Sequence, residues 1–218
     1  MTSNANKFLL LLAGLLLIGA CNKATEVYTD SFVMNYSIHD GIELAYELEP
    51  GTAQHGLKLR LKEPVKHVGY NSEGADKQLY DNLREKHNDI SFSRRVLLYN
   101  GVGGAGAMYP DYTSITVTSD SNFDNAHPAG TSLNDLIDCK YQSSYLYVVG
   151  GYADESLLEI KTKALADVVP NDLTMLARLN LYFTKNPAKL DNPHDISVSV
   201  TTDDGRTFTA SYTMNFNQ

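Results

Sequence analysis

Tryptophan is absent from this chain of 218 residues, and cysteine occurs only twice, as Cys21 and Cys139. A true immunoglobulin domain packs a buried tryptophan against a bonded cysteine pair, so the composition argues against that class. No histidine lies near Cys139 in the sequence to activate its thiol. Cys139 is therefore predicted to be a small buried residue rather than a nucleophile.

Positive charge is also scarce, with 18 Lys and Arg residues against 26 Asp and Glu residues. Lys7 is the only charged residue among residues 1–20, so removal of that segment would leave a net charge of −9. An acidic chain has no electrostatic reason to bind nucleic acid or an anionic lipid surface by charge alone. The sequence therefore predicts no nucleic-acid partner.

Complete catalytic or cofactor motifs are lacking as well. Gly101, Gly103 and Gly106 match the spacing of a dinucleotide fingerprint, but Tyr109 and Pro110 follow where a helix N-terminus is required. The six histidines form no metal-ligand pair at i, i+2 or i+4. No G-x-S-x-G motif or distinctive carboxylate pair indicates a hydrolase. The sequence thus predicts no cofactor, no metal ligand and no catalytic residue.

One acidic segment resembles a calcium loop in its first half. Asp120, Asn122 and Asp124 occupy alternate positions, but the sixth and twelfth positions of the motif are Asn125 and Thr131 instead of glycine and glutamate. Turn chemistry at the end of a strand explains the same residues. A bound cation is the alternative interpretation of this segment.

The N-terminus has the three-part pattern of an export signal. Residues 1–7 are polar and carry Lys7, and residues 8–20 form an apolar or small-residue run of 13. A helix of that length is too short for a hydrocarbon core about 30 Å thick, which needs about 20 residues. Residues 1–20 are therefore predicted to be a removable signal peptide.

The end of the apolar run indicates the type of signal. Ile18-Gly19-Ala20-Cys21 resembles a lipobox, in which an aliphatic residue and two small residues precede the cysteine. In bacterial lipoproteins, which this segment resembles, the cysteine sulfur receives a diacylglycerol group, cleavage occurs just before it, and acyl chains such as palmitate complete the anchor. Two or three chains hold a protein firmly on a membrane. The resemblance implies Cys21 as the lipidation site, residues 21–26 as a tether, and no internal disulfide.

Period-two alternation is the strongest signal in the rest of the chain. It predicts strands with one buried face around these apolar sets: Ile42 to Leu48, Leu57 to Leu61, Ile115 and Val117, Leu179 to Phe183, Ile196 to Val200, and Phe208 to Phe216. Such strands predict a mainly β fold, an antiparallel β-sandwich that is immunoglobulin-like in general shape, over residues 27–218. Residues 101–109 mark a potential subdivision of this domain.

Two hairpins are predicted from register. A three-residue loop at residues 203–205 pairs Val200 with Phe208 and gives both strands the same buried face, with Gly205 at positive φ. The same argument at residues 39–41 pairs Ile38 with Ile42.

Helical signals are few. Residues 76–87 predict a short surface helix with Leu79 and Leu83 as its apolar stripe, and residues 131–137 begin with good capping residues. Residues 154–168 fit a helix or a strand equally well.

Residues 115–137, with the string Pro128 to Leu136 as the most specific part, resemble uncharacterised lipoproteins of Bacteroidetes-type bacteria. The resemblance covers mainly residues 110–218. It implies a β-rich extracytoplasmic domain of unknown function behind a lipidated cysteine. In the lipoproteins that the chain resembles, surface export goes with a short acidic stretch just after the cysteine. Residues 22–26 depart from that pattern, so the sequence does not indicate which face of the outer membrane the domain occupies.

These observations predict a lipid-anchored, non-enzymatic β-domain at the outer membrane of the cell envelope, binding a protein partner or a saccharide. The 14 tyrosines fit the saccharide hypothesis, because tyrosine stacks on sugar rings, although such residues more often face a core. Two alternatives stay open: a hydrolase whose site is assembled from distant residues, and a purely structural envelope component.

Overall fold

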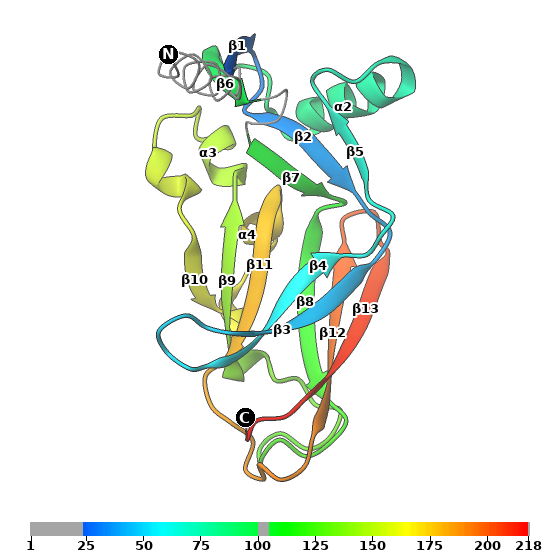
Figure 1. The fold of residues 1–218 in the computed structure, drawn as a ribbon, viewed down its shortest axis with the longest axis vertical. Helices are drawn as coiled ribbons and strands as arrows, with labels where there is room; N and C mark the ends of the chain where they lie inside the picture. Colours follow the sequence, from blue (N-terminus) through cyan, green and yellow to red (C-terminus); the bar gives the residue numbers. More distant parts are fainter. Residues whose placement is uncertain (1–23, 100–104, 218) are drawn as a thin grey trace, which may run out of the picture.

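A computed structural model of the chain describes residues 24–99 and 105–217, and β-strands dominate it (Figure 1). The predicted mainly β, sandwich-like fold with a few short helices is confirmed. The immunoglobulin-like general shape stays a prediction. Cys21 and the predicted signal peptide lie outside the described residues.

The sandwich consists of a five-stranded sheet and a three-stranded sheet that share one apolar core. In spatial order the larger sheet contains β10 (Lys161–Ala164), β9 (Ile137–Ser143), β11 (Leu176–Phe183), β4 (His55–Leu61) and β3 (Ile42–Leu48). The smaller sheet contains β13 (Thr207–Met214), β12 (His194–Thr202) and β8 (Tyr112–Ser119). Leu179 and Leu181 from the first sheet and Val198 from the second are fully buried in this core.

A second apolar core lies toward the end of the molecule where β1 is found (Figure 1). Its sheet is ordered β5 (Lys66–Gly69), β2 (Val33–Ile38) and β7 (Ala105–Tyr109), with β2 and β7 parallel. Helices α2 (Gly74–Lys86) and α3 (Tyr145–Val149) contribute Tyr80, Leu83 and Tyr147 to this core. The chain therefore passes several times between two separate sets of packed side chains.

A two-stranded sheet of β1 (Ala24–Thr29) and β6 (Arg94–Tyr99) continues this end of the molecule. The remaining short helices are α4 (Pro170–Leu173) and three 3₁₀ turns at Asn134–Leu136, Glu155–Leu158 and Leu165–Asp167. In the ranges that the structure describes, the helices are all too short or too polar to cross a membrane.

The alternating patterns predict most of the buried faces of the sandwich correctly, although Leu48 at the end of β3 is 48% exposed. Ile196, Val198 and Val200 alternate with partly exposed serines in β12, and Leu57 and Leu59 alternate with exposed Lys58 in β4. Every second side chain points to the same face of a strand, so the sequence alone identifies which set turns inward.

The hairpin at residues 203–205 has the predicted register. Val200 pairs with Phe208 and Ile196 with Tyr212, and Gly205 adopts φ of +84°. The loop is closed by the Thr202 amide, which donates to the Arg206 carbonyl at 2.9 Å.

The hairpin predicted at residues 39–41 is wrong. Strand β2 pairs with β5 and β7, where Tyr36 lies beside Val68 and Ala107, whereas β3 pairs with β4. The chain leaves one sheet for the other at this point, and the His39 amide donates to the Tyr109 carbonyl instead of closing a turn. Strand β4 offers β3 an alternating apolar face of leucines, in place of the Met34, Tyr36 and Ile38 that the local hairpin would have supplied.

The helix predictions are confirmed in part. Residues 76–87 correspond to α2, but its buried residues are Tyr80 and Leu83, and the predicted Leu79 is only partly buried. At residues 131–137 only the 3₁₀ turn Asn134–Leu136 forms, because the Asn134 side chain bonds the backbone of β8 at Ile115 and Val117. Residues 154–168, which fitted both structures, contain two 3₁₀ turns and strand β10.

Candidate functional site

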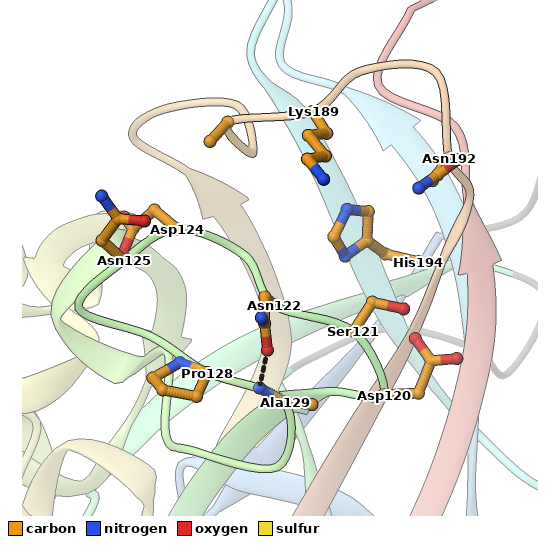
Figure 2. A pocket seen from close by; sticks show the side chains of 11 residues that line it. Asp120, Ser121, Asn122, Asp124, Asn125, Pro128, Ala129, Lys189, Asn192 and His194 are labelled. Carbon is orange, nitrogen blue, oxygen red and sulfur yellow. Dashed lines mark hydrogen bonds between the residues drawn. The ribbon is translucent and has the colours of Figure 1, made fainter.

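A polar hollow of about 600 Å³ opens at the end of the sandwich opposite β1 (Figure 1, Figure 2). Two loops form it, residues 120–133 after β8 and residues 184–193 before β12. Because β8 and β12 pair side by side, with Ser119 next to Ile196, the two loops emerge together. The Ala188 amide also donates to the Phe123 carbonyl at 2.8 Å and joins them directly.

His194, the first residue of β12, lies in the middle of the lining side chains (Figure 2). Only 1% of its surface is exposed, and its Nδ1 shares a hydrogen bond of 2.9 Å with Ser119 Oγ. Its ring also makes edge contacts with Phe123 and Phe216, with centroids 5.6 and 5.8 Å away. The imidazole is therefore held in one orientation by the core beneath it.

The three residues of the broken calcium motif do not point to a common centre. An Asp120 carboxylate oxygen accepts from the Asp195 amide at 2.9 Å, and Asn122 Oδ1 accepts from the Ala129 amide at 2.9 Å (Figure 2). Asp124 bonds a third set of partners. Within residues 24–99 and 105–217, no group of three or more His, Cys, Asp or Glu side chains is placed to hold a metal ion.

Asp124 is the centre of an ionic cluster on the rim of the hollow. Its carboxylate lies 2.7 Å from Lys185 Nζ and 2.7 Å from His127 Nδ1, and His127 Nε2 lies 3.1 Å from Asp135. The hydrogen bonds from Lys185 and then His127 lower the pKa of Asp124. The same bond to Asp124, with a further one to Asp135, raises the pKa of His127. The cluster closes the 120–133 loop at neutral pH and keeps Asp124 ionised.

We expect the substitution His127→Gln to change the pH dependence of stability. Because the pKa of His127 is raised from 6.5 in the folded state, its contribution is fully present below pH 6.5 and is lost as the pH rises past the folded pKa. The melting temperature of the wild type should exceed that of the variant most at about pH 5, and the gap should narrow toward about pH 8. A difference in melting temperature between wild type and variant that stays constant across this pH range would contradict the role assigned to His127.

The other residues singled out in the sequence are now placed. Cys139 is fully buried, as predicted, and burial raises the pKa of its thiol to about 12, so it is not a nucleophile at neutral pH. Residues 101–104 lie outside the described part, and Gly106 lies within β7, after which the chain enters β8. The described end of the glycine motif thus leads into a strand instead of a helix.

Tyrosine does not line the hollow. Among the tyrosines whose side chains the structure describes, seven are buried: Tyr36, Tyr80, Tyr112, Tyr141, Tyr147, Tyr152 and Tyr182. Tyr28, at 66% exposure, is the large apolar side chain most open to solvent among those described, and it bonds Ser93 on the neighbouring segment. The tyrosine content therefore reflects core packing more than a sugar-stacking face.

Sequence reasoning did not identify the hollow, because most of its lining comes from two loops without periodicity. One signal was available: His194 continues the inward-facing series of Ile196 and Val198, and an inward histidine at a strand end indicates a special environment.

No protein-family model, curated protein or solved structure matches the chain. The fold and hollow define a β-sandwich protein with a polar pocket at one end. Its resemblance to Bacteroidetes-type lipoproteins stays a prediction.

Proposed function

We propose that the chain is a lipid-anchored, non-enzymatic binding module of the cell envelope, whose hollow holds a hydroxyl-rich ligand such as a saccharide. The observation that carries this proposal is the position of the hollow. It lies at the end of the long axis opposite β1, and β1 begins three residues after Cys21 (Figure 1). A lipid on Cys21 would put the membrane beside β1 and turn the hollow away from it.

The chemistry of the lining supports a ligand with many hydroxyl groups. Asn125 and Asn192 offer both donors and acceptors, Lys189 offers donors, and Asp120 offers acceptors. Binding sites of this kind orient a ligand by a few placed polar groups. A side chain with both donor and acceptor atoms suits a hydroxyl, which also donates and accepts.

The state of the carboxylates favours binding over hydrolysis. A glycosidase needs one carboxyl group that keeps a proton near neutral pH and a second that is ionised. Asp124 has a lowered pKa because Lys185 and His127 bond it, so it is a poor proton donor. Asp120 already accepts a backbone hydrogen bond from the Asp195 amide at 2.9 Å.

A binding screen with neutral saccharides tests the proposed ligand class. The purified full chain in detergent should bind at least one member of a neutral glycan array, and Asn192→Ala should weaken that binding roughly three- to tenfold, the loss of one or two hydrogen bonds. Asn71→Ala, the same substitution at an exposed position between β5 and α2, should leave affinity unchanged. Silence across the array, or equal losses in both variants, would reject the saccharide.

The anchor has its own test. Cells that express Cys21→Ala should produce a protein that incorporates no labelled palmitate, because the acceptor sulfur is gone. The wild-type chain grown in parallel should take up the label. Labelling of the variant at the wild-type level would show that Cys21 is not the lipidation site.

A further inference from the structure

A second surface feature lies on the outer face of the five-stranded sheet, which is the face turned away from the sandwich core. A hollow of about 420 Å³ is lined there by Glu47 of β3, by Lys58 and Arg60 of β4, and by Arg178 and Asn180 of β11. A neighbouring hollow of about 150 Å³ adds Lys140 of β9 and shares Glu47, Arg178 and Asn180 with the first. We call these joined hollows the basic groove.

Strand register explains why cations gather in the basic groove. Asn180 lies at the centre, with Lys58 opposite it on β4 and Lys140 opposite it on β9. Arg178 is two residues before Asn180, and Arg60 is two residues after Lys58 on the antiparallel strand, so both point outward from the next row. Adjacent strands are about 4.8 Å apart, so the four cationic side chains on these three neighbouring strands lie close together.

These cations are compensated only in part by the protein itself, because Glu47 lines both hollows and Glu43 lies opposite Arg60 on β3. Lys140 pairs with Glu49 at 3.1 Å, but Lys58, Arg60 and Arg178 make no ion pair with the described part of the chain. Like charges next to one another on a sheet face are destabilising. In an acidic chain this local excess of positive charge is complementary to a negatively charged ligand, and arginine pairs with carboxylate or sulfate through two parallel hydrogen bonds.

Asn180 carries a further clue to the ligand. Its Nδ2 donates to Glu47 at 3.1 Å and to the Tyr182 hydroxyl at 3.1 Å, whereas its buried Oδ1 has no donor. An unpaired acceptor in the lining is suited to a donor such as a hydroxyl. Cations alone would fit any anion, but cations beside an unpaired acceptor fit a ligand with both acidic and hydroxyl groups. The groove runs across several strands, which suits a chain more than a single small anion.

We propose that the basic groove binds an acidic polysaccharide, a sugar chain with carboxylate or sulfate groups. This site is separate from the hollow at the end of the sandwich and does not depend on the function proposed for it. The acidic groups lie against Arg60, Arg178 and Lys58, and the hydroxyl groups face Asn180.

Titration of the full chain in detergent with polygalacturonate tests the proposal. The wild type should bind at an ionic strength of about 0.01 M and more weakly at about 0.15 M, because salt screens exposed charges. The double variant Arg60→Gln, Arg178→Gln should lose affinity about tenfold or more. The signal measured with neutral dextran should be the same for the wild type and this variant.

The matched control removes two positive charges elsewhere. Lys66→Gln with Lys77→Gln changes β5 and α2, away from the groove, and should bind polygalacturonate as the wild type does. An equal loss of affinity in this control would show that net charge alone causes the effect, and it would overturn the proposed site. Absence of wild-type binding at low salt would overturn it as well. Polyglutamate binding of equal strength and equal sensitivity to the arginine variant would assign the groove to an acidic peptide instead.

Discussion

The substitution Asp89→Ala is expected to lower the free energy of unfolding by about 3–5 kcal/mol, because it leaves several buried donors without an acceptor. Asp89 has no exposed surface, and its carboxylate accepts four hydrogen bonds. The donors are Ser31 Oγ at 2.7 Å, the amides of Phe32 and Val33 at 2.8 Å each, and the Tyr152 hydroxyl at 2.9 Å. These bonds join the residue just after α2 to the start of β2 and to the segment after α3.

Chemical denaturation with two graded variants checks this expectation. Tyr152→Phe removes one of the four donors and should cost about 1 kcal/mol. Asp89→Asn keeps one acceptor oxygen and should fall between the two, which keeps the comparison informative when the alanine variant does not fold. A loss below about 1 kcal/mol for Asp89→Ala would show that the carboxylate does not organise this core.

The second large effect is expected at Asp111, which joins the two apolar cores. Its Oδ2 lies 2.7 Å from His87 Nε2 and 3.1 Å from Lys86 Nζ at the end of α2, and its Oδ1 accepts from the Met175 amide at 2.9 Å. His87 in turn bonds the Tyr36 hydroxyl at 3.0 Å. Asp111→Ala should cost about 3–5 kcal/mol, because it leaves buried partners unpaired.

A control and a pH series sharpen this test. Asp203 also contacts Lys86 but is more exposed, so Asp203→Ala should cost less than about 1 kcal/mol. Burial acts to raise the pKa of Asp111, but the bonds from His87 and its neighbours outweigh it and lower the pKa. The stabilisation is present above pH 3.8 and is lost as the pH falls through the folded pKa. The gap between wild type and Asp111→Ala should therefore shrink in acid. Equal losses at Asp111 and Asp203 would contradict the buried role.

The two Asp-Gly turns show how far sequence reasoning reaches. Both segments have the same dipeptide and the same matching of apolar faces, yet only residues 203–205 form a hairpin. At residues 39–41 the partner of β3 is β4, and the partners of β2 are β5 and β7, about 30 and 70 residues further along. Alternation tells which face of a strand is buried, but every strand of a sandwich offers such a face, so alternation cannot choose the neighbour.

The candidate sites depend even more on distant pairing. The hollow needs β8 beside β12, which brings Asp120 close to Asp195, and the basic groove needs β4 and β9 on either side of β11. In the sequence, Lys58 and Arg60 belong to one alternating cationic series, whereas Lys140 and Arg178 lie far from it in an acidic chain. Their joint positive field exists only because three strands from distant segments lie next to one another.

By itself, the sequence determined what is local: the inward faces of the strands, the helix at α2, the turn at Gly205 and the burial of Cys139. It also predicts Cys21 as the anchor, a position outside the described residues. Only the tertiary structure decided which strands are neighbours, how two cores share one chain, and where polar loops and cations converge. Local patterns reflect backbone geometry over a few residues, whereas partner choice depends on the summed packing of side chains far apart in the chain.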